Sequence, residues 1–275
     1  MKRLIHLFAL LLLLPMSMIA QQPQAPIKAK PGIVAHRGFH RMEGSAENSI
    51  FAMRQAVTHD FEGTEFDVQI TSDGVAIVYH DAIMQGHVIR ETPYDTLRQL
   101  TAFTLKNGET VPLLDAFMEA CSQALREQEQ RGKHTQLFFE IKEVKQQEQR
   151  HHLLGQIIEA IGKYGLHDDI FFISFDLEAC MMMAQLMPDV PMAYLEGDLS
   201  PQDLRDRGIF GLDYHKRCLI EHPEWVEEAH NLGMTVNAWT VNDAETAKKM
   251  LNLGVDFITT DEPLKMRGWI GVEEE

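Results

Sequence analysis

The sequence predicts an α/β protein with the (β/α)8 TIM barrel fold, carrying a β-hairpin extension after the second strand and a small insertion before the third barrel strand. Three observations support this fold class. Short apolar runs alternate with longer amphipathic stretches along the chain. Eight such runs fall in about 240 residues, a length typical of one barrel domain. Polar residues concentrate where the runs end, and the ends of barrel strands are where this fold carries its sites.

The N-terminal residues are expected to precede the barrel. Lys2 and Arg3 begin the chain, an apolar run extends from Leu4 to Pro15, and small or neutral residues lead to Ala20. This layout is typical of a secretory signal peptide over residues 1–20. A membrane anchor is the alternative, but the run falls short of the roughly 20 residues that a spanning helix needs.

Residues 21–30 are polar and contain proline, which favours a tether. Residues 31–272 then form one predicted domain, because they contain no linker-like tract. We therefore expect an exported protein, periplasmic or secreted, with no stable membrane anchor after cleavage.

The barrel strands are predicted as runs rich in Val, Ile and Phe. This composition suits a parallel sheet that is buried on both faces. In chain order the strands are Gly32–Ala35, Gly63–Val68, Gln136–Ile141, Ile170–Phe175, Pro191–Leu195, Ile209–Asp213, Thr235–Trp239 and Phe257–Thr260.

Amphipathic stretches of helical length lie between these strands. An alternation of this kind favours a closed barrel over an open doubly wound sheet. The helical candidates are Asn48–His59, Leu113–Glu129, Lys145–Tyr164, Leu177–Leu186, Pro223–Asn231 and Ala244–Leu253.

A hairpin interrupts the alternation after the second strand. Residues 71–74, Thr-Ser-Asp-Gly, are a turn signal, and an extended run follows directly through Tyr79. No crossover helix fits in four residues, so the two runs must be antiparallel. Folding the chain back about a two-residue loop, Ser72 and Asp73, places His80 opposite Glu65 and Val78 opposite Asp67. The hairpin would therefore return His80 to the carboxylates.

Polar side chains end several of the predicted strands. Residues spaced by two on a strand point to one face, and the carboxyl ends of barrel strands meet at one mouth. The predicted site therefore combines His36 and Arg37 after the first strand, Glu65 and Asp67 in the second, His80 after the hairpin, Glu140 and Lys142 in the third, and Trp239 in the penultimate strand.

Three carboxylates converging on one mouth indicate a cation. They would repel one another, and their pKa values would rise unless something neutralised them. Oxygen ligands suit one divalent ion, Ca²⁺ or Mg²⁺. The three cysteines lack the spacing of metal ligands, and no paired histidine motif is present, which speaks against zinc. Arg37 and Lys142 add fixed positive charge that suits a phosphate, and two histidines suit acid–base work near neutral pH.

The formal net charge of −16 limits the partners. Such a surface argues against nucleic acid or an anionic membrane. An anionic substrate must then be held in a pocket made locally positive by a metal ion or by Arg and Lys.

Each polar residue also has a simpler interpretation. Any one of 13 histidines is more often a surface residue than a functional one. A Glu-x-Asp pair in a strand is commonly a solvated face, Lys142 could pair with Glu140 on a surface, and Trp239 could be plain core. Their joint placement at successive strand ends favours a site.

The ordered set of motifs resembles a known family. His36-Arg37-Gly38, Glu47-Asn48-Ser49, Glu65-Phe66-Asp67-Val68, His80-Asp81, Glu140-Ile141-Lys142 and Trp239-Thr240-Val241-Asn242 closely resemble those of the glycerophosphodiester phosphodiesterases, over about Ile33 to Pro263. The resemblance implies a phospholipase-C-like (β/α)8 barrel. It also implies hydrolysis of glycerophosphodiesters to glycerol phosphate and an alcohol with a divalent metal.

The resemblance also implies a role for each matching residue. His36 and His80 would be the acid–base pair, and Glu65, Asp67 and Glu140 the metal ligands. Arg37 and Lys142 would hold the phosphate, Trp239 would form an apolar wall, and Glu47 and Asn48 would support the site. The order of the two histidines' roles, the choice between water and a glycerol hydroxyl as nucleophile, and the choice between Ca²⁺ and Mg²⁺ stay open.

Two departures from the family's pattern affect the expectations. Ala46 stands where the family usually has proline, which should change only how rigidly the loop enters its helix. The segment after Asp81 lacks the family's usual polar stretch and instead has residues 82–87, Ala-Ile-Met-Gln-Gly-His. Because this segment would overhang the mouth, the alcohol of the substrate is the part of the function least defined by the sequence.

Two other functions remain as alternatives. A phospholipase D or lysophospholipase-type phosphodiesterase on intact lipid would need an exposed apolar rim, for which Phe39, Ile83 and Met84 are the candidates near the mouth. A non-catalytic barrel that captures a phosphorylated metabolite would have no need of both histidines together with three carboxylates.

Overall fold

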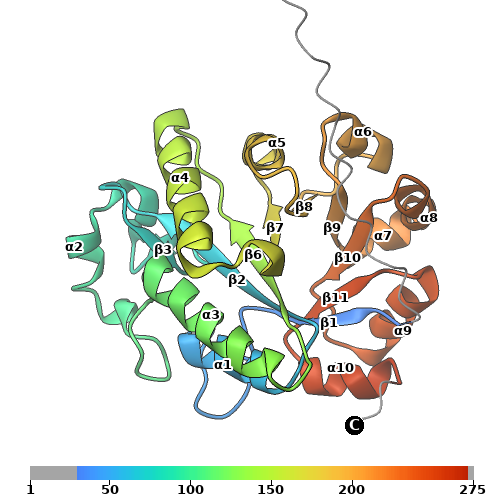
Figure 1. Ribbon diagram of the computed structural model, residues 1–275, viewed down its shortest axis with the longest axis horizontal. Coiled ribbons are helices and arrows are strands. Elements are labelled where there is room, and N and C mark those ends of the chain that lie inside the picture. The colour runs from blue at the N-terminus through green and yellow to red at the C-terminus, as the bar shows by residue number, and fades with distance from the viewer. Residues whose placement is uncertain (1–29, 272–275) are drawn as a thin grey trace, which may run out of the picture.

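The computed structural model describes residues 30–271, in which eight parallel strands close into a barrel surrounded by helices (Figure 1). Each strand pairs with the next, and β1 pairs with both β11 and β2, which closes the ring. The barrel strands are β1 (Gly32–Ala35), β2 (Gly63–Ile70), β6 (Gln136–Ile141), β7 (Ile170–Ser174), β8 (Met192–Tyr194), β9 (Gly211–His215), β10 (Thr235–Trp239) and β11 (Phe257–Thr260). The predicted (β/α)8 fold is confirmed.

Strand boundaries agree with the prediction in β1, β6, β10 and β11. The largest difference is β9, predicted over Ile209–Asp213, which begins at Gly211 and continues to His215. Ile209 and Phe210 are buried in the connection that precedes the strand. Asp213 consequently lies in the middle of a barrel strand rather than at its end.

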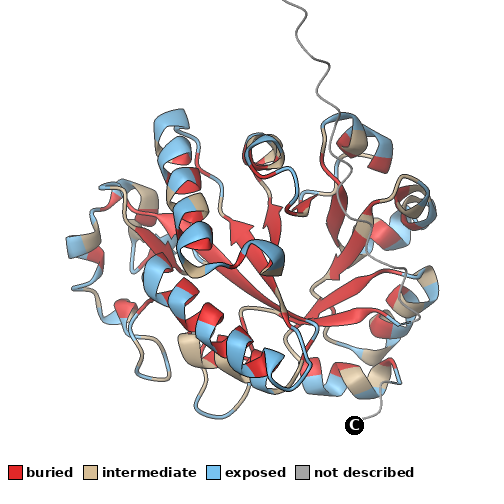
Figure 2. Ribbon diagram, viewed as in Figure 1, coloured by how far each residue is buried: buried red, intermediate tan, exposed pale blue. Residues whose placement is uncertain are grey.

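The helices cover the outside of the barrel with their apolar faces inward (Figure 2). Side chains cap several of them: Ser49 accepts from Ala52 N at α1, Asp176 caps α5, and Asp243 caps α9. The helices outside the insertion are α1 (Ile50–Thr58), α3 (Leu114–Glu129), α4 (Gln147–Tyr164), α5 (Leu177–Leu186), α6 (Pro201–Asp206), α7 (Lys216–Glu221), α8 (Glu224–Asn231), α9 (Ala244–Leu253) and α10 (Pro263–Trp269). Helices α6, α7 and α10 were not predicted, because they are too short to show a helical period.

The predicted hairpin is present, but its predicted register is wrong by one residue. β3 (Ala76–Val78) runs antiparallel to β2, with Val78 opposite Val68 and Ala76 opposite Ile70. His80 therefore does not lie opposite Glu65, nor Val78 opposite Asp67. The loop has three residues rather than two, because Gly74, at φ +84°, follows the turn and donates its N–H to Thr71.

The insertion follows the hairpin and carries a small core of its own. It contains β4 (Ile83–Met84), β5 (His87–Val88), α2 (Tyr94–Leu97) and two short 3-10 turns, Ile89–Glu91 and Thr101–Phe103. Its core packs against the outer side of the hairpin and consists of Ile77, Met84, Ile89, Leu97, Phe103 and Val111.

Phenylalanine rings fill the inside of the barrel below the mouth. Phe138 stacks on Phe171, with ring centroids 4.8 Å apart, and meets Phe257 edge to face at 5.2 Å. These rings press on β2 so closely that a Cβ on Gly63 would lie 2.7 Å from Phe138. The interior is thus closed below, and only the carboxyl ends of the strands are left to form a site.

The predicted signal peptide over residues 1–20, all of the predicted tether 21–30 except Lys30, and the last domain residue, Val272, lie outside the described residues. Among residues 30–271, no helix combines the length and apolar character needed to cross a membrane.

Candidate active site

Three buried carboxylates form the centre of the mouth. Glu65 and Asp67 come from β2, and Glu140 comes from β6, where it lies directly opposite Asp67 in the register. One oxygen of each lies within 4.8 Å of the others, the separation expected of groups that could share a metal ion. One oxygen of Glu65, Oε1, is buried without a hydrogen-bond partner among the described residues.

Lys142 and Asn48 partly offset the cost of burying these three negative charges close together. The Lys142 ammonium lies 2.8 Å from Asp67 Oδ1 and 2.7 Å from Glu140 Oε1. Asn48 donates to Asp67 Oδ2 at 2.7 Å and accepts from Asp67 N at 3.0 Å. Asn48 takes up φ +58°, which orients its amide toward β2 from the loop before α1.

The pKa values of the three carboxylates show that Lys142 and Asn48 do not fully offset this cost. Burial, then the charges of Asp67 and Glu140, hold the pKa of Glu65 well above its ordinary value. Burial and Asp67 raise the pKa of Glu140 to about 8. Burial opposes ionisation of Asp67 as well, but Lys142 outweighs it and lowers the pKa of Asp67. A divalent cation would remove the remaining repulsion, so the donor set fits a Ca²⁺ or Mg²⁺ ion.

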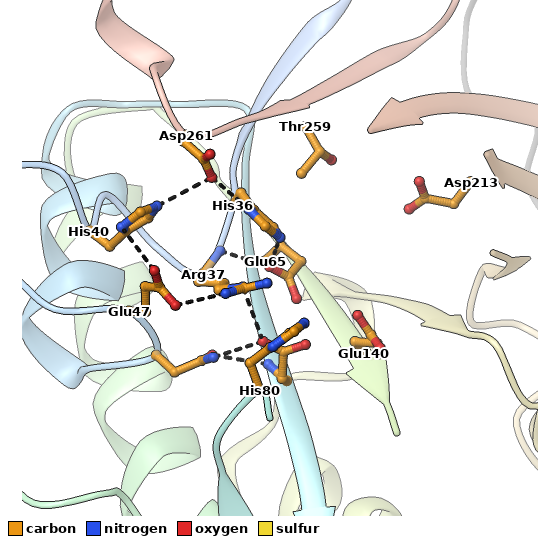
Figure 3. Close-up of polar contacts among 12 residues, drawn as sticks. His36, Arg37, His40, Glu47, Glu65, His80, Glu140, Asp213, Thr259 and Asp261 are labelled. Carbon is orange, nitrogen blue, oxygen red and sulfur yellow. Dashed lines mark hydrogen bonds and ion pairs between the residues drawn. The ribbon is translucent and has the colours of Figure 1, made fainter. Parts of the chain in front are cut away.

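His36 is oriented by a carboxylate from the last strand end (Figure 3). Its Nδ1 lies 2.7 Å from Asp261 Oδ1, which leaves Nε2 facing the pocket, 3.9 Å from Glu65 Oε2. Asn242 donates to the other oxygen of Asp261 at 2.6 Å, and His40 lies 3.3 Å from Oδ1. These contacts lower the pKa of Asp261 despite its partial burial.

Arg37 joins the first strand end to the carboxylates. Its backbone N–H donates to Glu65 Oε2 at 2.7 Å, and its guanidinium donates to Glu47 Oε2 at 2.7 Å. Its Nε lies 3.9 Å from Asp67 Oδ2. The chain turns at Arg37 and Gly38, whose φ values are +53° and +76°, and so presents both the backbone and the side chain of Arg37 to the site.

His80 reaches the mouth although it lies beyond the paired part of β3. Its Nδ1 lies 2.7 Å from Asp81 Oδ1, and burial lowers the pKa of His80. His80 lines the central pocket with His36, Glu65 and Glu140. The predicted convergence of His80 with the carboxylates is therefore present, but it does not come from the predicted register.

The central pocket has a volume of about 130 Å³ and one apolar wall. Trp239 and Phe175 meet edge to face in this wall, with centroids 5.6 Å apart. The indole N–H of Trp239 donates to the backbone carbonyl of Asp213 at 2.8 Å, which holds the ring upright against β9. Lys142 lies instead in a neighbouring pocket with Gln69 and Arg90, and Glu140 and His80 line both.

The structure brings all ten predicted site residues to one mouth and adds three that the sequence analysis did not assign. Asp261 and His40 support His36, and Asp213 lies at the floor of the central pocket. Asp261 directly follows the last strand, so the rule that located the other residues could have found it. The same rule could have found Asp213, because the predicted strand Ile209–Asp213 ended at it, although the structure places Asp213 in the middle of β9.

A closed barrel with titratable groups gathered at the carboxyl ends of its strands defines the class of (β/α)8 barrel enzymes. The model of the glycerophosphoryl diester phosphodiesterase family matches residues 36–265, and the chain belongs to this family. It is accordingly a phosphoric diester hydrolase, and the resemblance found in the sequence is confirmed.

Individual relatives agree with this assignment. A glycerophosphodiester phosphodiesterase of Parabacteroides distasonis has a similar structure, with a TM-score of 0.79 and 36% identity over 88% of this chain and 97% of that one. A glycerophosphodiester phosphodiesterase of Bacillus altitudinis is 29% identical over 84% of this chain and 94% of its own length. An Oleispira antarctica phosphodiesterase, in complex with the product sn-glycerol-3-phosphate, has the same fold, with a TM-score of 0.70 and 24% identity over 88% and 97%.

Proposed function

We propose that this chain is an exported, metal-dependent glycerophosphodiester phosphodiesterase in which His36 and His80 act as general acid and base. It would hydrolyse small glycerophosphodiesters to glycerol phosphate and an alcohol. The observation that carries the proposal is that both histidines share one pocket with Glu65 and Glu140, which form a cluster of buried carboxylates with Asp67.

Glu65, Asp67 and Glu140 would hold one divalent cation, Ca²⁺ or Mg²⁺. The partnerless oxygen of Glu65 and the raised pKa values of Glu65 and Glu140 support this role. When bound, the ion would supply positive charge against the phosphoryl oxygens. Arg37 and Lys142 would add fixed positive charge beside the same carboxylates, and Glu47 and Asn48 would hold Arg37 and Asp67 in place.

The two histidines are arranged for proton transfer. Each has its Nδ1 on a carboxylate, Asp261 for His36 and Asp81 for His80, so each presents Nε2 to the pocket. One Nε2 would take the proton of the attacking hydroxyl, and the other would give a proton to the leaving alkoxide, as the P–O bond to the alcohol breaks. Trp239 would exclude water from the apolar side.

Small soluble diesters are favoured over intact lipid. Of the three apolar residues expected to form a docking rim, Phe39 and Met84 are buried, and only Ile83 is exposed, at 54%. One exposed apolar side chain is normal for a soluble surface and does not make a lipid-docking patch. The Oleispira antarctica relative, in complex with sn-glycerol-3-phosphate, supports a small-molecule substrate.

Export is proposed from the sequence of residues 1–20 alone, with residues 21–30 as the tether and residues 31–272 as one domain. Expression of the full chain in a Gram-negative host, followed by mass spectrometry of the periplasmic fraction, tests it. We expect a mature chain that begins at Gln21. Full-length protein in the cytoplasm would contradict export without bearing on catalysis.

The activity is tested with a panel of glycerophosphodiesters and with lysophospholipid micelles, after EDTA treatment and with Ca²⁺ or Mg²⁺ restored. We expect hydrolysis of the diesters only when metal is present. His36→Ala and His80→Ala should lose most turnover, roughly 100-fold or more, because each removes a proton-transfer group. His151→Ala, on the exposed side of α4, serves as the control and should retain full activity. Activity in EDTA, or cleavage of micelles alone, would refute the proposal.

A further inference from the structure

A buried carboxylate lies at the floor of the central pocket without any role in the mechanism above. Asp213, in the middle of β9, is 1% exposed and lines the pocket on the side away from His80. Figure 3 shows its carboxylate directed toward the space that Glu65, Glu140 and Thr259 surround. Its Oδ1 has no hydrogen-bond partner among residues 30–271. A buried carboxylate oxygen left unpaired is costly and calls for a ligand.

The neighbouring strands hold this carboxylate in place from behind. Asn237 on β10 donates one amide hydrogen to Asp213 Oδ2 at 2.9 Å and the other to Thr259 Oγ1, on β11, at 2.8 Å. Both amide hydrogens of Asn237 are thus used, and the side chain bridges three adjacent strands. Because the Thr259 hydroxyl accepts from Asn237, its own proton remains to be donated elsewhere.

The floor therefore presents an acceptor and a donor together. Asp213 Oδ1 can accept a hydrogen bond, and the Thr259 hydroxyl, which also lines the pocket, can donate one. An alcohol hydroxyl both donates and accepts, so it satisfies both groups at once. A quaternary ammonium could use the carboxylate but offers nothing to the Thr259 proton.

We propose that Asp213 and Thr259 form a hydroxyl-binding subsite that recognises the glycerol moiety of the substrate and so selects glycerol diesters over diesters that lack a hydroxyl there. This inference rests on the proposed glycerophosphodiesterase function and names two residues that determine its specificity.

The dimensions of the pocket place glycerol, rather than the leaving alcohol, on this floor. The volume of about 130 Å³ suits a three-carbon unit and is well below the roughly 300–1,000 Å³ of pockets for larger ligands. Two apolar side chains, Ile173 and Leu195, line the same pocket as Asp213. A second, separate pocket opens on the other side of His80, lined by Tyr79, Thr104 and Lys106, and leaves room for the alcohol.

A matched pair of substrates tests the inference. Both diesters carry the same alcohol; one has glycerol on the other side of the phosphorus, and the other has propyl in its place. We expect wild type to prefer the glycerol diester by about 100-fold or more in kcat/KM, because a site built to bind a hydroxyl leaves buried groups unpaired with an analogue that lacks it. Asp213→Asn and Thr259→Val should each lower kcat/KM for the glycerol diester about 10-fold or more while changing that for the propyl diester less than about twofold.

Two further variants make the result specific. Thr259→Ser keeps the hydroxyl and should retain the preference. Thr235→Val, at the opposite end of β10, changes a threonine of the same barrel outside the pocket and should leave both substrates unaffected. The inference is overturned if wild type does not distinguish the two diesters, or if Asp213→Asn slows both equally. It is also overturned if Asp213→Asn slows only diesters with a cationic alcohol, which would make the floor a site for the head group.

A binding measurement separates this inference from the proposed function. Calorimetry with sn-glycerol 3-phosphate and with propyl phosphate requires no turnover. We expect wild type to bind the former at least about 10-fold more tightly, and Asp213→Asn to lose that difference. If no diester is hydrolysed with either metal, the proposed function fails, and the calorimetric preference, or its absence, still decides for or against the subsite.

Discussion

The carboxylate of Asp261 is shared by several side chains around His36. His36 and His40 approach Oδ1 at 2.7 and 3.3 Å, and Asn242 and Arg41 approach Oδ2 at 2.6 and 3.2 Å. At the other end of the same strand, Asp256 holds His230 at 3.0 Å and accepts from Val236 N. The last strand thus has an aspartate–histidine pair at each end: Asp261 with His36 at the mouth and Asp256 with His230 at the base.

These two pairs make a matched experiment. Asp261→Asn should reduce kcat roughly 100-fold or more, because His36 loses the group that fixes its tautomer and orientation. Asp256→Asn should instead cost about 1–3 kcal/mol of unfolding free energy and leave kcat unchanged. Steady-state kinetics and urea unfolding of both variants check this. Equal effects on kcat would contradict an orienting role for Asp261.

Asp213 should make stability depend on pH. Burial raises the pKa of Asp213 to about 7, whereas the unfolded chain has an ordinary value near 3.9. The folded state therefore binds the proton more tightly, so stability is lost as pH rises from about 4 to about 7, by up to about 4 kcal/mol. Asp213→Asn removes this loss. Urea unfolding in EDTA should show the variant gaining stability relative to wild type at pH 8 but not at pH 4; an equal difference at both would exclude the effect.

Individual site residues were predictable where a strand end located them. His36, Glu65, Asp67 and Glu140 lie where the ends of apolar runs placed them, because a barrel mouth is fixed by strand direction alone. The partners of these residues were not predictable. The carboxylate that holds His36 and the contact of Lys142 with Asp67 depend on neighbours that meet only after the ring closes.

At the scale of elements, the loop from β1 to α1 packs closely against α1 at Gly38 but not at Gly44. A Cβ on Gly38 would lie 2.7 Å from the Ala52 carbonyl carbon and 2.8 Å from Met53 N, both backbone atoms of α1. Gly44, in the same loop, has the same φ of +76° but nothing within 4 Å of such a Cβ. The two glycines therefore share backbone conformation and differ only in their surroundings.

Replacing each of the two glycines by alanine separates the cost of backbone strain from the cost of the contact with α1. Gly44→Ala should cost about 1–2 kcal/mol, the penalty of a left-handed conformation for an L-residue. Gly38→Ala should cost about 2–5 kcal/mol, because α1 must also move, and it should lower kcat by displacing Arg37. Urea unfolding and kinetics measure both. Similar losses of stability in the two variants would show that the contact with α1 contributes nothing.

Elements were predictable from the sequence to the extent that their pattern is local. Long runs such as Gln136–Ile141 and Thr235–Trp239 define their strands by themselves, and Leu177–Leu186 its helix. The register of β3 was not predictable from the local pattern, because one left-handed glycine, Gly74, adds a residue to the turn and shifts every later pair.

The whole molecule carries a strong negative charge around a pocket that must accept an anion. The formal net charge is −16, and the positive side chains nearest the three carboxylates are Arg37 and Lys142. The overall field should therefore slow the approach of an anionic substrate.

This repulsion should be visible in the salt dependence of kcat/KM. A diester of two uncharged alcohols has a net charge of −1, and one with a quaternary ammonium alcohol has none. Raising the ionic strength from about 0.01 to about 0.15 M shortens the screening length from about 30 to about 8 Å. We expect kcat/KM to rise severalfold for the anionic diester and to stay constant for the zwitterionic one. If kcat/KM for the anionic diester fell with rising salt, the positive charge at the mouth would outweigh the negative charge of the surface.

One edge of β2 pairs with two different strands, and this affects which part of the molecule can be replaced without disturbing the rest. One edge of this strand pairs with β1 at Gly63 and Thr64 and, further along, with β3 at Val68 to Ile70, while Glu65 and Asp67 lie between the two contacts. At β2 the closed ring of the barrel is joined to the hairpin and the insertion that follows it, which have a small core of their own. We expect that the insertion after His80 can be exchanged for another of different shape without opening the ring, so that the surroundings of the mouth change while the carboxylates of the ring stay in place.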